Sequence, residues 1–137
     1  MTQWLAGMVI TADRLNDGID PTTTTSGATA STGFSLSSFS GRRTGKVVTV
    51  TVNCTRTGAM ISETSAGSGN IDDTAMATLP SGWRPPELME ALWDSGFNDG
   101  GATISTSGVI TLRTTSGSAG INTGHNPRVS ASWIADD

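Results

Sequence analysis

The chain has 137 residues, enough for one domain, and its 12 acidic and 8 basic residues give a formal net charge of −4. This acidic balance excludes a sequence-independent nucleic-acid binder, which needs a basic surface. Thr and Ser make up 39 residues and hydrophobic residues only 35%, so we expect a shallow core and a homo-oligomer that buries further surface between subunits. No apolar stretch approaches the roughly 20 residues that span a bilayer, so we expect no membrane insertion.

Residues 1–33 differ in composition from the rest of the chain. Thr11 is a suitable N-cap and Gly18 a suitable C-terminal glycine, which predicts a helix of about two turns between them. The Thr-rich run that follows Pro21 predicts an extended linker or a first edge strand. We therefore predict an N-terminal attachment segment over residues 1–33. Its apolar residues are the predicted docking residues: Trp4, Met8, Ile10 and Leu15.

From Phe34 onward the pattern is that of β-strands. Residues 46–56 alternate most clearly, because Val48, Val50, Val52 and Cys54 share one parity and polar residues take the other. We expect that apolar parity to face the core.

The start of this region shows an irregularity. Phe34 and Leu36 alternate with serines, whereas Phe39 follows out of phase. Residues 88–93 fit either a strand or a helical turn, and we predict a strand, since an isolated helix would interrupt a regular series of strands.

The second half contains the strongest turn signals. Residues 102–115 predict a hairpin that turns at Ser107-Gly108, because glycine supplies the positive φ of a tight turn. Residues 128–134 predict a final strand, and residues 78–86, with three of the five prolines, predict a rigid extended corner. About seven or eight short strands with Gly/Ser turns predict an all-β, antiparallel β-sandwich, jelly-roll-like, over residues 34–137.

Residue patterns typical of catalysis and metal binding are missing from the sequence. One cysteine and one histidine cannot supply the ligands of a zinc site, and Cys54 has inward parity. Residues 94–101 are rich in oxygen ligands but lack the alternating acids and closing Glu of a calcium loop, which favours a plain hairpin loop. We predict a protein that is not an enzyme and binds no cofactor or metal.

Four residues are candidates for contact with a receptor or glycan. Trp83 lies in the proline corner, where it either packs across the corner or stacks on a sugar ring. Asn98 and Asp99 lie in the oxygen-rich loop, and His125 lies in a loop before the last strand, where it either braces the loop or contacts a ligand.

Two stretches carry a resemblance to a known family. Residues 4–17 follow the pattern Trp-x-x-Gly-Met-x-hydrophobic-Thr-Ala-x-x-Leu-Asn, which is similar to the N-terminal opening of minor tail and fibre-like proteins of phages infecting actinobacteria. The corner at residues 79–85, followed by a Gly-turn hairpin and a closing strand, resembles small β-sandwich domains of phage fibres and receptor-binding proteins. The resemblance implies a trimeric sandwich on the virion, attached by its N-terminal segment.

The resulting expectation is a non-catalytic phage virion surface protein. It would be made in the host cytoplasm and assembled into the particle, with itself, other virion proteins and a host cell-surface glycan as partners. A minor tail or receptor-binding protein is the first interpretation. A capsid decoration protein or head fibre is the alternative, because the chain is short for a tail fibre, and a carbohydrate-binding module is the further alternative.

Overall fold

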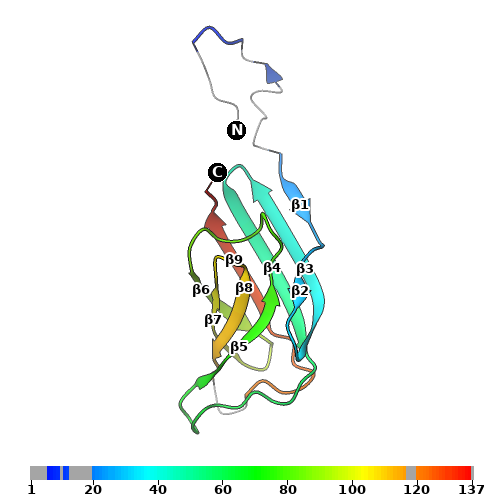
Figure 1. The fold of residues 1–137 in the computed structure, drawn as a ribbon, viewed down its shortest axis with the longest axis vertical. Helices are drawn as coiled ribbons and strands as arrows, with labels where there is room; N and C mark the ends of the chain where they lie inside the picture. The colour runs from blue at the N-terminus through cyan, green and yellow to red at the C-terminus, as the bar shows by residue number, and fades with distance from the viewer. Residues whose placement is uncertain (1–5, 10, 13–19, 117–119, 137) are drawn as a thin grey trace.

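The structure is a computed structural model, and it describes residues 6–9, 11–12, 20–116 and 120–136. Its regular elements are antiparallel β-strands, so the predicted all-β class is confirmed (Figure 1). In chain order the strands are β1 (Thr22–Thr24), β2 (Thr29–Ala30), β3 (Phe34–Thr44), β4 (Val47–Arg56), β5 (Asn70–Thr78), β6 (Met89–Asp94), β7 (Asp99–Ile104), β8 (Val109–Thr114) and β9 (Arg128–Ile134).

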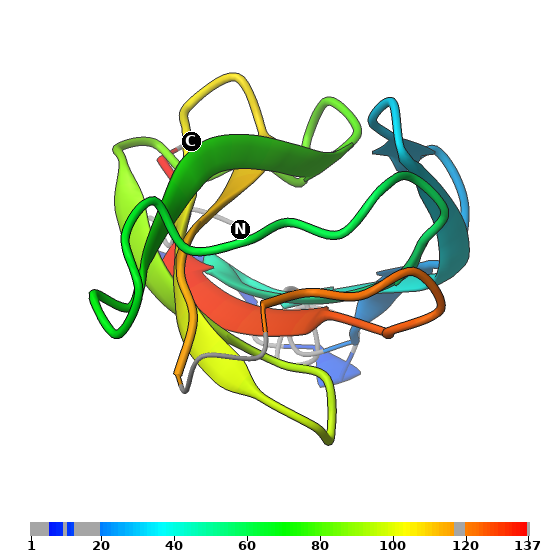
Figure 2. The ribbon, with the colours of Figure 1, turned by 90° about the horizontal axis from the view of Figure 1, so that it is seen from below.

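The strands form one hydrogen-bonded sheet in the order β1-β3-β4-β9-β6-β7-β8-β5-β2. This sheet curls into a half-barrel, as the view from below shows (Figure 2). The sequence predicted a sandwich of two sheets, whereas the observed strands are continuous. The pairing between β6 and β9 is short and consists of two residue pairs, Trp93 with Val129 and Asp94 with Arg128. That joint connects two walls, β1-β3-β4-β9 and β6-β7-β8-β5-β2.

The Trp93 side chain packs into this joint. It is 1% exposed, and its indole Nε1 donates a hydrogen bond to the Thr114 carbonyl at 2.9 Å. Gly100 makes room for the ring, since a Cβ there would lie 2.7 Å from Nε1 and 1.9 Å from the Thr114 oxygen. Trp93 therefore ties β6 to β8 across β7, while its backbone pairs with β9.

The core lies on the concave face of the curled sheet. The predicted inward face of β4 is confirmed, because Val48, Val50, Val52 and Cys54 are all fully buried. The predicted hairpin is confirmed as well, with β7 and β8 joined through Gly108 at φ +85°. The other large, fully buried apolar residues are Met76, Leu79, Ile104, Ile110, Leu112, Ile121 and Val129.

A β-bulge accounts for the change of phase in β3. The register with β4 shifts between Leu36 and Ser38, which inserts one extra residue into β3. Phe34 and Phe39 consequently both face the core, at 7% and 4% exposure, although they are five residues apart.

The proline corner connects β5 to β6, and residues 79–86 contain neither helix nor strand, as predicted. Leu79 and Pro85, which are part of the corner, are buried. The Trp83 ring is half-buried and packs on Gly41 of β3, where a Cβ would come within 2.6 Å of the ring. The corner thus packs against the opposite edge of the curled sheet.

The Thr-rich run after Pro21 forms the edge strand β1, which was one of the two predictions for it. Residues 22–24 pair with β3 and residues 29–30 pair with β5, so the sheet begins at Thr22 and not at Phe34. Hydrogen bonding to two sheet edges holds this Thr-rich stretch despite its low apolar content. The predicted helix falls mostly on residues 13–19, which lie outside the described part. A strand was predicted over residues 88–93 and is confirmed, since residues 89–93 lie in β6.

The two ends of the half-barrel carry different parts of the chain (Figure 1). At the end that we call proximal, β1 enters, β3 turns into β4, and Val47 pairs with Ile134 near the end of β9. At the opposite, distal end, Asn53 and Asp94 both pair with Arg128, and the loops before β7 and β9 lie there.

The buried thiol of Cys54 gives a pH-dependent prediction. Desolvation by burial raises the pKa of Cys54 from 9.0 to about 11, so the unfolded chain releases this proton first. The stabilising contribution is complete below pH 9 and is lost as the pH rises through 11, a decrease of about 2.7 kcal/mol in the free energy of unfolding. Urea unfolding followed by tryptophan fluorescence between pH 8 and 11 measures it. Cys54→Ala is the control, and an equal decrease in both proteins would contradict the assignment.

Candidate functional site

Two loops that are distant in sequence meet at the distal end. Asn98, between β6 and β7, donates from Nδ2 to Thr115 Oγ1 at 2.9 Å and to the Gly120 carbonyl at 2.5 Å. The sequence predicted both loops as receptor contacts but gave no reason for their proximity. We call residues 94–99, 115–116 and 120–127 the distal loop cluster.

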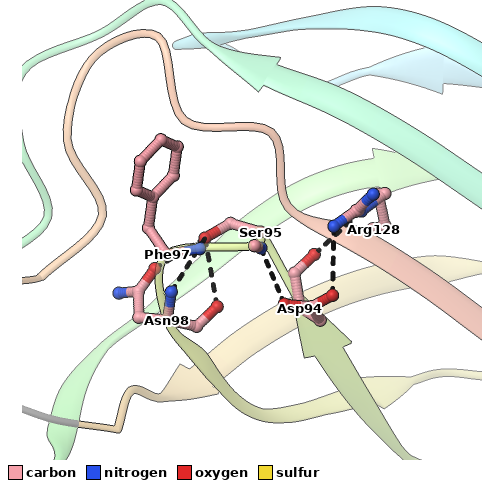
Figure 3. Close-up of polar contacts among 6 residues, drawn as sticks. Asp94, Ser95, Phe97, Asn98 and Arg128 are labelled. Carbon is pink, nitrogen blue, oxygen red and sulfur yellow. Dashed lines mark hydrogen bonds and ion pairs between the residues drawn. The ribbon is translucent and has the colours of Figure 1, made fainter.

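Side-chain hydrogen bonds hold the turn at residues 94–99 in one conformation (Figure 3). Asp94 Oδ1 accepts from the Gly96 N–H at 2.7 Å. Ser95 Oγ accepts from the N–H groups of Phe97 and Asn98 and donates to Asn98 Oδ1 at 2.7 Å. Gly96 has φ +81°, which a side chain at this position would strain. The turn is therefore ordered by its own polar groups.

Phe97 projects from this ordered turn into solvent. Its side chain is 79% exposed, and its ring stacks on that of His125 with centroids 4.6 Å apart and an interplanar angle of 10°. Sequence reasoning considered His125 but missed Phe97. A single aromatic residue between Gly96 and Asn98, in an otherwise polar turn, was the available signal.

The charged groups of the cluster are at the surface. Asp94 and Arg128 form an ion pair at 3.0 Å with side chains 63% and 49% exposed, so the pair contributes little to stability. Asp99 is exposed and accepts a short hydrogen bond from the Ser116 hydroxyl.

A hollow of about 460 Å³ opens beside the cluster, on the convex face where β6 diverges from β9. Its lining combines an exposed leucine with polar groups. The lining residues are Thr51, Leu92, Trp93, Asp94, Asp99, Arg128 and Ser130.

The structure brings three of the four predicted contact residues together in the distal loop cluster, namely Asn98, Asp99 and His125. Asp99 is exposed there and His125 is half-buried. Asn98 is 7% exposed and its amide already has partners, so it holds the two loops together and does not face a ligand. Trp83 packs on β3 and lies outside the cluster.

Of the predicted docking residues, only Met8 lies in the described part of the chain. It is half-buried, and its neighbour Val9 is 74% exposed. The other three, Trp4, Ile10 and Leu15, fall outside the described residues.

No constellation with obvious chemistry occurs in the described part of the chain. Three or more His, Cys, Asp or Glu side chains do not gather there as a metal site would require. Within the same residues, no helix is long and apolar enough to cross a membrane. No protein-family model matches the chain, and a search of the curated proteins returns no match. The distal loop cluster is the best-defined candidate site, and its groups suit binding.

Asn98→Ala should destabilise the protein by about 1–3 kcal/mol, because it leaves the Gly120 carbonyl and Thr115 hydroxyl without their buried donor. Urea unfolding measures this loss. Asp94→Asn is the matched control in the same turn: it keeps the acceptor for Gly96 and removes only an exposed ion pair, so we expect a change below about 0.5 kcal/mol. Equal effects of the two substitutions would show that Asn98 does not hold the loops together.

Proposed function

We propose that this chain is a non-catalytic surface protein of a bacteriophage particle, of the minor tail or receptor-binding type. It forms a homotrimer of sandwich-like domains, attaches to the virion through its N-terminal segment and contacts the host with its distal loop cluster. The observation that carries the proposal is the end-to-end arrangement of the domain: the chain enters the sheet at the proximal end, and the distal loop cluster lies at the opposite end. The motif resemblance of residues 4–17 and 79–85 supports the same assignment.

This end-to-end arrangement follows from the strand register. β1 begins opposite Arg43, beside the turn into β4, so the chain that precedes the sheet enters at the proximal end. The distal loop cluster lies at the other end of β4 and β9 (Figure 1). A domain held by its leading segment therefore points an ordered set of loops away from its attachment.

The convex face of β4, β9 and β6 supports the proposed self-association. Four large aliphatic side chains are exposed on or next to these strands: Val47 at 54%, Leu88 at 61%, Leu92 at 77% and Ile134 at 70%. Side-chain hydroxyl groups of β4 and β9 form hydrogen bonds with one another on this face, Thr49 with Ser132 at 2.7 Å and Thr51 with Ser130 at 2.6 Å.

These aliphatic and hydroxyl groups are neutral, and the charged residues of outward parity on the three strands are Glu90 and the ion pair of Asp94 with Arg128. The hollow beside Leu92 can also receive an apolar side chain of a neighbouring subunit. The division of the half-barrel into two walls joined by two residue pairs supports the proposal of a sandwich-like subunit.

A capsid decoration protein or head fibre would have the same end-to-end arrangement. The number of copies per particle distinguishes a capsid position from a tail position. Quantitative mass spectrometry of purified particles should find on the order of tens of copies for a tail protein and on the order of hundreds for a capsid protein, since the two sites differ in symmetry. A chain that is missing from purified particles would refute both.

Deleting residues 1–18 should abolish incorporation into particles while leaving the sheet folded. The physical reason is that pairing of the sheet begins at Thr22, so the deletion removes none of its hydrogen bonds. Particle mass spectrometry measures incorporation, and circular dichroism with thermal unfolding measures folding. Truncated protein that is unfolded, or that is incorporated normally, would contradict the proposed division of roles.

Leu92→Arg should dissociate the trimer, because it places a charge in an apolar contact without affecting the core of the subunit. Size-exclusion chromatography with light scattering should show a trimer for the unmodified protein and a monomer for the variant. Thr106→Arg is the control, since Thr106 is exposed in the β7–β8 turn, away from the proposed face. A monomeric unmodified protein at micromolar concentration would overturn the assembly.

A further inference from the structure

The Phe97 side chain leaves an apolar ring in water at a position that the loop holds in place. Burying an aromatic side chain is favourable, yet Phe97 is 79% exposed. A single exposed apolar residue is normal on a protein surface, so the exposure of Phe97 gains meaning only from the order of its surroundings. Here the turn that carries the ring is braced by Ser95, Asp94 and the buried Asn98 amide.

His125 fixes the plane of the exposed ring. Its imidazole lies parallel to Phe97 at 4.6 Å, and its own backbone is held on both sides. The His125 N–H donates to the Asn122 carbonyl at 3.0 Å, and its carbonyl accepts from the Arg56 N–H at 2.8 Å. A platform whose two rings are ordered before binding loses little conformational entropy when a ligand stacks on it.

The surroundings of Phe97 indicate which ligand chemistry fits. The distal loop cluster presents carboxylate and hydroxyl groups at its surface, from Asp99, Ser116 and Thr123. A protein–protein hot spot would instead be enclosed by further apolar contacts that exclude water. A pyranose ring has one apolar C–H face for stacking and a rim of hydroxyls for hydrogen bonding, which matches an isolated aromatic ring in polar surroundings.

The charges of the cluster favour a neutral ligand. Its two carboxylates are Asp94 and Asp99, and Arg128, which borders it, is already paired with Asp94. A sialylated, sulfated or phosphorylated glycan would meet uncompensated negative charge there.

We propose that Phe97, stacked on His125, is the central contact of a site for a neutral saccharide at the distal end. This inference deepens the proposed function, on which it rests for its biological setting, by naming the chemical class of the host ligand.

The test uses the full chain on a glycan array that contains neutral, sialylated and sulfated saccharides, followed by calorimetry with the best neutral ligand. We expect binding to neutral saccharides, a loss of about tenfold or more in Phe97→Ala, and retention in Phe97→Trp, which keeps an aromatic face. Met60→Ala is the control, because Met60 is also apolar and 51% exposed but lies outside the cluster, and it should bind as the unmodified chain does. Unchanged thermal unfolding in each variant establishes that a loss of binding is not a loss of folding.

Three outcomes would overturn the saccharide inference: no glycan binding, binding of acidic glycans only, or equal binding by Phe97→Ala. If no glycan binds while particles carrying Phe97→Ala lose adsorption to host cells, the saccharide inference fails and the proposed function stands. If Phe97-dependent saccharide binding is found but the chain is missing from purified particles, the saccharide site stands and the virion assignment fails.

Discussion

The packing of Trp93 against Gly100 is the constraint on which the rest of the architecture depends. The indole fills the space that a side chain at position 100 would occupy, and its N–H reaches the Thr114 carbonyl on β8. At the same residue the backbone pairs with Val129, one of the two residue pairs that join the walls of the half-barrel. One buried side chain thus determines where β6, β7, β8 and β9 meet.

The candidate site follows from that joint. Asp94 is the residue after Trp93 and pairs with Arg128, so the turn at residues 94–99 must leave the sheet beside the start of β9. There it meets the segment before β9, and the buried Asn98 amide fastens the two together. The same divergence of β6 from β9 opens the hollow beside Leu92. A core interaction therefore positions both the loops proposed to contact the host and the face proposed to contact other subunits.

The division of polar groups is consistent with a binding role. Ser95 and Asn98 are buried and use their hydrogen bonds to shape the loop, whereas Asp99, Ser116 and Phe97 remain at the surface. Sequence reasoning placed Asn98 among the contact residues because it lies in an oxygen-rich loop. Its burial depends on partners 17 and 22 residues further along the chain, which no local pattern indicates. Phe97 had a local signal as a lone aromatic residue in a polar turn, whereas its stacking on His125 is set by the fold.

Local periodicity was sufficient for the strands themselves. The alternation around Val50, the glycine turn at Gly108 and the final strand ending near Ile134 all follow from the conformational preferences of short segments, and the structure confirms them. The curling of the strands into one sheet, the place of β9 between β4 and β6, and the pairing of residues 22–30 with both edges were decided by tertiary structure. Such pairings join segments far apart in the chain, and their stability depends on which side chains fit together once the sheet has curled.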